Sequence, residues 1–265
     1  MFDSQNILFA FFLTTVTGLS TGIGSLIALL AKKTNTSFLS LSLGFSAGIM
    51  IYVSFMEMLP EALSSMTSLY GDKQANLFLI LAFFAGIAFI SIIDFLIPEN
   101  VNPHEVHGVE EMHEGRQLKR TGMVVALTTA IHNFPEGIAT FTSALESLDI
   151  AVPITVAIAI HNIPEGIAVA VPVYHSSGSR RKAFWYSFAS GLAEPLGALI
   201  AYLFLFRFWT ATTNAIVLAA VAGIMVFISL DELLPTAEKY GKHHIAIAGV
   251  VAGMIIMAVS LYLFI

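Results

Sequence analysis

Eight long apolar runs, separated by short polar connections, dominate the pattern of hydrophobic and polar positions along the chain. The runs lie near residues 7–30, 38–63, 76–97, 121–146, 150–174, 183–207, 214–236 and 245–265. Each has roughly 20 to 26 residues, enough for one α-helix to cross the ~30 Å hydrocarbon core of a bilayer. Strands of membrane barrels alternate over only about ten residues, so the runs predict helices. We therefore expect an all-α polytopic membrane protein, with eight transmembrane helices in one domain over residues 1–265.

The composition excludes a soluble domain and several kinds of site. Of the 265 residues, 57% are hydrophobic and only 11% are charged. The chain has no cysteine, which excludes disulfides and cysteine-ligated metal sites. A nucleic-acid-binding protein needs a basic surface, and the net charge of -6 does not indicate one. The segment 1–6 has no basic residue of the kind that precedes a cleaved signal sequence, so we expect the first run to remain as a span.

The basic residues between the runs predict the orientation in the membrane. If the N-terminus lies outside, the outward connections hold only Lys73 and Arg207. The inward connections then hold ten basic residues: Lys32, Lys33, Arg116, Lys119, Arg120, Arg180, Arg181, Lys182, Lys239 and Lys242. Because basic residues gather on the cytoplasmic side, both termini are expected outside.

A stretch of the second run recurs in the seventh. Ala47-Gly48-Ile49-Met50 matches Ala222-Gly223-Ile224-Met225, and in the same register Ser54, Glu57 and Leu59-Pro60 match Ser229, Glu232 and Leu234-Pro235. The second and seventh helices would cross the membrane in opposite directions. The pattern predicts a 3+2+3 organisation, in which helices 1–3 and 6–8 form an inverted repeat around a central pair, as in transporters that alternate access. Chance similarity of two glycine-rich helices is the alternative.

Glycines four residues apart indicate close helix packing at three places, namely Gly18 with Gly22, Gly44 with Gly48, and Gly249 with Gly253. The connection over about 98–120 is expected on the cytoplasmic side. It carries the histidines and carboxylates His104, His107, His113, Glu99, Glu105, Glu110, Glu111 and Glu114. Such a segment either collects metal weakly or is an ordinary solvated connector.

Two copies of one polar phrase lie in the middle of the fourth and fifth runs. His132-Asn133-Phe134-Pro135-Glu136-Gly137-Ile138-Ala139 recurs 29 residues later as His161-Asn162-Ile163-Pro164-Glu165-Gly166-Ile167-Ala168. In each copy the His and Glu are four residues apart, so they share one helical face. Each proline also frees a backbone carbonyl one turn earlier. Imidazole, carboxylate, amide and carbonyl groups together are ligands that suit borderline divalent ions.

Glu194, in the sixth run, adds a third mid-membrane carboxylate to Glu136 and Glu165. An ionised group at that depth costs about 2.5–3.5 kcal/mol on insertion scales. No Lys or Arg lies mid-span to pair with these carboxylates, so a bound divalent cation is the natural compensation. The alternatives are satisfied packing of His–Glu pairs and a pure proton relay.

Four further residues are candidates for the transport pathway. Met50 lies mid-span, where its thioether would contact a soft ion or simply pack. Glu57 lies on the same face nearer the outer surface, and Asp231 and Glu232 lie near the inner end of the seventh helix. Carboxylates at opposite mouths would draw cations in and pass them out, and ordinary interfacial charge is the alternative.

The paired His-Asn-x-Pro-Glu-Gly phrases, with Gly191-Leu192-Ala193-Glu194-Pro195-Leu196-Gly197 after them, resemble the ZIP (Zrt/Irt-like) metal transporter family in its bacterial branch. The resemblance extends over essentially all 265 residues. It implies eight helices in a 3+2+3 arrangement, with a paired metal site between the fourth and fifth. By position, the first metal is implied to bind His132, Glu136, His161 and Glu165, with Met50 beside it. The second is implied to bind Asn133, Asn162 and Glu194, with Glu136 and Glu165 bridging.

The resemblance also implies an elevator-like sliding of the helices that bear the site, and a homodimer. We expect transport of divalent cations, chiefly Zn²⁺ and also Fe²⁺, Mn²⁺, Co²⁺ or Cd²⁺, into the cytoplasm by alternating access. We expect no enzymatic activity, no resident cofactor and a bacterial inner membrane location.

Two rival functions differ in class. An intramembrane metalloenzyme would need a pattern such as His-Glu-x-x-His or the Glu-x-x-His of di-iron bundles, and neither occurs in the two phrases. A proton-driven channel or pump with a structural metal would bind metal without exchanging it.

Overall fold

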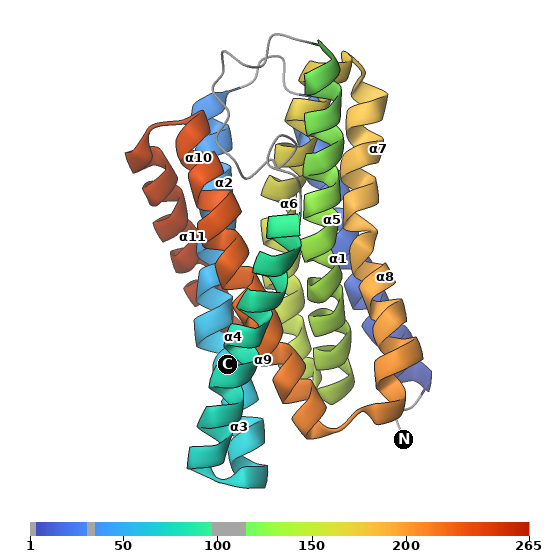
Figure 1. The fold of residues 1–265 in the computed structure, drawn as a ribbon, viewed down its shortest axis with the longest axis vertical. Coiled ribbons are helices and arrows are strands. Elements are labelled where there is room, and N and C mark those ends of the chain that lie inside the picture. The colour runs from blue at the N-terminus through green and yellow to red at the C-terminus, as the bar shows by residue number, and fades with distance from the viewer. Residues whose placement is uncertain (1–3, 31–34, 97–114, 265) are drawn as a thin grey trace.

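The structure of the protein, a computed structural model, describes residues 4–30, 35–96 and 115–264 (Figure 1). In that part of the chain every long element is a helix and no strand occurs. The predicted connection covers residues 98–120. Its part up to residue 114, which includes its three histidines, lies outside the described residues. These observations confirm the predicted all-α fold.

Each apolar run coincides with one helical segment. The helices are α1 (Ser4–Leu30), α2 (Thr36–Val53), α3 (Leu59–Tyr70), α4 (Asp72–Leu96), α5 (Gly115–Glu146), α6 (Leu148–Ser177), α7 (Arg180–Gly191), α8 (Ala193–Ile200), α9 (Ala211–Ile228), α10 (Leu234–Tyr240) and α11 (His243–Phe264). Within the described residues, seven helical segments are long and apolar enough to span a bilayer. The remaining long helix is α5, which carries the first polar phrase. The chain is therefore a polytopic helical membrane protein.

Short polar side chains begin several helices by accepting a hydrogen bond from the first turn. Asn35 caps α2, Ser147 caps α6, Ser179 caps α7 and Thr210 caps α9. Gly178 ends α6 with a φ of 64°, a left-handed conformation that glycine adopts without steric cost. Only Ser147 separates α5 from α6, so these two helices are forced to pack as antiparallel neighbours.

Two π-helical turns lie at matched positions of the inverted repeat. One covers Ser54–Met58 between α2 and α3, and the other covers Ser229–Leu233 between α9 and α10. A Leu-Pro pair follows each turn directly. Proline has no N–H to donate, which is a common reason for such a widened turn. The same irregularity in both copies supports a true repeat rather than chance similarity.

Glycines set the closest helix contacts, as the four-residue spacings predicted. A Cβ at Gly48 would overlap the backbone of Val250, and one at Gly253 would overlap the backbone of Phe45. These two contacts join α2 to α11. Gly18 meets the backbone of α7 in the same way. At all three positions a larger residue would force the helices apart.

The central pair α5 and α6 divides the remaining helices into two groups (Figure 1). On one side, α1 packs on α6 and α7, and α8 packs on α5. On the other side, α2 packs on α11, α4 packs on α9, and α2 and α9 contact the central pair. The two halves of the repeat are therefore interleaved: each side of the central pair contains helices from both halves.

Candidate metal site

The two polar phrases face each other in the middle of the bundle. Gly137, next to Glu136, lies against the backbone of Glu194 on α8, where a Cβ would overlap it. Gly166, next to Glu165, lies in the same way against the backbone of Thr21 on α1. Each phrase therefore places a carboxylate one residue before a close helix contact, and the contact of α5 with α8 brings Glu194 to the same depth.

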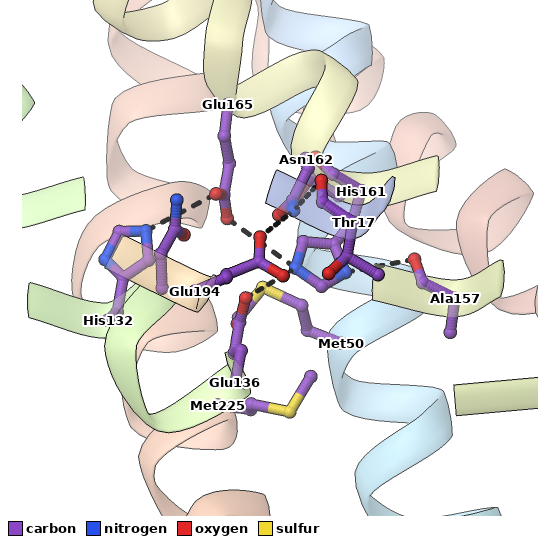
Figure 2. Close-up of polar contacts among 12 residues, drawn as sticks. Thr17, Met50, His132, Glu136, Ala157, His161, Asn162, Glu165, Glu194 and Met225 are labelled. Carbon is purple, nitrogen blue, oxygen red and sulfur yellow. Dashed lines mark hydrogen bonds and ion pairs between the residues drawn. The ribbon is translucent and has the colours of Figure 1, made fainter. Parts of the chain in front are cut away.

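The histidine of each phrase contacts the glutamate of the other. His161 Nε2 lies 3.2 Å from Glu136 Oε2, and His132 Nε2 lies 3.5 Å from Glu165 Oε2 (Figure 2). Within one phrase, His161 Nε2 lies 4.0 Å from Glu165 Oε1. The antiparallel packing of α5 and α6 thus crosses the pairs, so that all four side chains converge on one region.

His161 is oriented by a second contact. Its Nδ1 lies 3.1 Å from the carbonyl oxygen of Ala157, which can only accept a hydrogen bond. Nδ1 therefore carries the hydrogen, and Nε2 points toward Glu136. A backbone carbonyl that holds the outer nitrogen of an imidazole is a common support for a metal-binding histidine.

The two asparagines anchor the site to neighbouring helices. Asn162 Nδ2 donates to Glu194 Oε1 and, at 3.0 Å, to the carbonyl of Thr17 on α1. Asn133 Nδ2 donates at 3.3 Å to the carbonyl of Ser190 on α7. In both amides the oxygen has no hydrogen-bond partner among the described residues. Each oxygen is therefore available to a cation.

The site concentrates buried negative charge. Glu136 and Glu194 are fully buried, and Glu165 is 2% exposed. Each of the three has at least one carboxylate oxygen without a hydrogen-bond partner in the described part of the chain. The ion pairs that these side chains form have histidine as the basic partner. Buried carboxylates in this state favour a cation strongly.

Among the described residues, no group of three or more His, Asp or Glu side chains is arranged as a ready-made coordination shell. The side chains meet in pairs instead. Two ligands of a tetrahedral zinc, each about 2.1 Å from the ion, lie about 3.4 Å apart. The 3.2 Å and 3.5 Å contacts between His and Glu are close to that separation. An ion between the partners would therefore need small side-chain adjustments.

Two buried methionines border the polar groups. Met50 on α2 and Met225 on α9 are both fully buried and lie beside Glu136 in Figure 2. They occupy the same position in the two halves of the repeat. The repeat was visible in the sequence, but only Met50 was predicted at the site. Met225 was not predicted at the site, although its match to Met50 in the repeat is a signal that the sequence contains.

The structure places the predicted pathway carboxylates at different distances from the site. Glu232 lies directly against it, with Oε2 3.5 Å from His132 Nδ1. Glu57 is half-buried on the π-helical turn that follows α2. Asp231 is partly exposed and lies beside Glu232 in the chain. Thr17 and Ser190, which receive the asparagine amides through their carbonyls, carried no signal in the sequence.

These features define a class: a polytopic helical membrane protein whose central helix pair holds a candidate cation site of crossed His–Glu pairs. The family model described as ZIP zinc transporter matches residues 5–94 and 98–261. The chain therefore belongs to the ZIP zinc transporter family. This confirms the resemblance noted in the sequence, and it favours a transporter over an enzyme.

Bacterial relatives align with almost the entire chain. A protein named zinc transporter ZupT from Clostridium perfringens is 57% identical over 280 residues, covering 99% of this chain and 98% of the relative. A zinc transporter ZupT from Streptococcus mutans is 58% identical and covers 99% and 100%. One from Nitratidesulfovibrio vulgaris is 51% identical and covers 100% of both chains.

Proposed function

We propose that this protein carries Zn²⁺ across the membrane into the cytoplasm, through the crossed His–Glu site and by alternating access. The observation that supports this most is the pairing of His161 with Glu136 and of His132 with Glu165 across two antiparallel helices. The names of the bacterial relatives, all zinc transporters, agree with this cargo.

The ion binds by replacing its water ligands and the contacts between the His and Glu side chains. A hydrated cation sheds water as carboxylate oxygens of Glu136, Glu165 and Glu194 that lack a hydrogen-bond partner among the described residues replace it. The imidazoles of His132 and His161 then bind the ion in place of their carboxylate contacts. Asn133, Asn162 and Met50 border the ion and complete its surroundings. Oxygen and nitrogen ligands without thiolate accept several borderline ions, so Fe²⁺, Mn²⁺, Co²⁺ and Cd²⁺ are proposed as secondary cargo.

The carboxylates outside the central pairs mark the path. Glu57 attracts the ion at the outer mouth, and Asp231 and Glu232 receive it on the way to the cytoplasm. The contact of Glu232 with His132 supports a direct transfer from the site in that direction. Protons replace the metal on the carboxylates and imidazoles during the return.

The surroundings of the protein are part of the proposal. The ten-to-two distribution of basic residues supports termini that lie outside, and the bacterial relatives support an inner (plasma) membrane location. We also propose a homodimer in the lipid bilayer, in which helices that carry the site slide as a unit.

Uptake of labelled Zn²⁺ by liposomes that contain the purified protein tests the proposal. The double variant His132→Ala with Glu136→Ala should abolish uptake, and Glu238→Gln, at an exposed carboxylate on α10, should leave it unchanged. Uptake that survives in the double variant contradicts the site assignment. Bound Zn²⁺ that never exchanges would favour a channel or pump with a structural metal. Competition by the other ions and imposed pH gradients test the range of cargo and the coupling.

A further inference from the structure

A column of polar side chains leads away from the site along α5. Thr140, Ser143 and Glu146 follow Glu136 at intervals of four, three and three residues, which keeps all four on one face of the helix. The opposite face of this stretch, including Phe141, packs in an apolar cluster with α1 and α8. The column therefore faces the interior between α5 and the helices on its other side.

Two hydroxyls in this column are buried without hydrogen bonds. Thr140 is fully buried and Ser143 is 1% exposed. Neither hydroxyl oxygen has a hydrogen-bond partner in the described part of the chain, although each could bond to its own helix. The neighbouring hydroxyl of Thr142 does so, since it donates to the carbonyl of Ala139 at 3.2 Å. Unpaired buried oxygens on one face suit a path for a partly hydrated cation.

The column ends at a polar contact between α5 and α9. Asn214 Nδ2 donates at 2.7 Å to Glu146 Oε2. Asn214 is only 4% exposed, and its side-chain oxygen has no hydrogen-bond partner among the described residues. One carboxylate and one buried amide oxygen are thus fixed together at the end of the column.

A second carboxylate lies near Glu146, and a third lies near the second. Glu61 on α3 interacts electrostatically with Glu146 and also with Glu57. Within the described residues, no Lys or Arg forms an ion pair with any of the three. Like charges held together without a cation repel one another, and a divalent ion relieves that repulsion.

We propose that Glu61, Glu146 and Asn214 form an outer binding site for a divalent cation, and that Thr140 and Ser143 line its path to Glu136. This inference rests on the proposed transport function. An all-oxygen ligand set suits a cation that keeps part of its water, so the site would bind weakly and with little selectivity. It would concentrate Zn²⁺ at the end of the bundle where α5 meets α6, the side assigned as external by the basic residues.

Uptake kinetics distinguish a specific outer site from a general effect of negative charge at this end of the bundle. Glu146→Gln removes the charge but keeps an acceptor for Asn214, so the contact between α5 and α9 is preserved. Asp72→Asn removes one exposed charge from the same end of the bundle and serves as the matched control. For Glu146→Gln we expect a roughly tenfold higher half-saturating Zn²⁺ concentration with an unchanged maximal rate, and for Asp72→Asn no change. Equal kinetics in the two variants would overturn the outer site, while absence of uptake by the parent would overturn the transport function instead.

A binding measurement tests the outer site without transport. In the background of His132→Ala with Glu136→Ala, calorimetric titration with Zn²⁺ should retain one weak binding event. Adding Glu146→Gln should remove that event, and adding Asp72→Asn should not. A double-variant background that binds no Zn²⁺ while it unfolds at the parent's temperature would refute the proposal. The pair Thr140→Val with Ser143→Ala should lower the maximal uptake rate without removing the weak event.

Discussion

Nε2 of His161 on α6 lies closer to Glu136 on α5, at 3.2 Å, than to Glu165 on its own helix, at 4.0 Å. The corresponding contact of His132 is with Glu165, at 3.5 Å. The site is therefore built between two helices and not along one. Its geometry depends on the register of α5 against α6, which the single-residue connection at Ser147 constrains, while Gly137 and Gly166 hold the two helices against α8 and α1.

Glu136→Gln should reduce Zn²⁺ uptake strongly. The substitution removes a buried charge and weakens the contact with His161, so we expect a loss of roughly 10- to 100-fold in transport efficiency. Initial rates over a range of Zn²⁺ concentrations in liposomes measure it. Glu136→Asp, which keeps the charge on a shorter side chain, should lose less. Equal losses in the two variants would show that charge is not what Glu136 contributes.

Gly137→Ala should disturb the site through the backbone of α8. The added Cβ would overlap Glu194, and the displacement of α8 should lower stability by about 1–3 kcal/mol. Thermal unfolding in detergent measures the stability, and Zn²⁺ uptake reports the position of Glu194. Leu127→Ala, at a side chain 57% exposed on the same helix, is the control and should change neither. A Gly137→Ala protein with parental stability and uptake would show that α8 can move away freely.

Substituting the two buried methionines tests whether their sulfurs contact the ion. Met50→Leu and Met225→Leu approximately preserve volume and remove the thioether, at a packing cost of less than about 1.5 kcal/mol. Sulfur ligands favour softer ions, so the ratio of Cd²⁺ to Zn²⁺ uptake should fall if the sulfur binds. We expect the fall in Met50→Leu. Competition uptake with both ions measures the ratio, and an unchanged ratio in that variant would assign Met50 to packing alone.

Restoring a backbone donor at the π-helical turns should lower the transport rate. The backbone amide that follows each turn donates to a serine carbonyl five residues earlier. Leu59 donates to Ser54, and Leu234 donates to Ser229. Pro60→Ala supplies an N–H that lets the turn close to α-helical geometry. That closure would rotate the preceding residues by about 100° relative to α3 and change where Glu57 points. Uptake by Pro60→Ala and Pro235→Ala measures the effect, and parental rates in folded variants would show that the turns are not needed.

The fold class could be read from the chain because a bilayer imposes simple rules. Apolar runs of span length must be helices, since every backbone group needs an internal partner. The same rules predict that the two polar phrases lie at similar depth in the membrane. The match of Met50 and Glu57 with Met225 and Glu232 predicts the two halves of the inverted repeat. The matched π-helical turns were not visible, because proline allows either a kink or a widened turn, and the packing of neighbouring helices decides between them.

The sequence by itself determined the ligand types, their four-residue spacing and the membrane setting, because these depend on local chemistry and on the periodicity of a helix. Only the tertiary structure decided which histidine faces which glutamate, that Glu232 reaches His132, and that Asn214 joins Glu146. These contacts depend on the register and distance between helices far apart in the chain. Packing at positions such as Gly137 and Glu194 sets that register, and no pattern within a single helix records it.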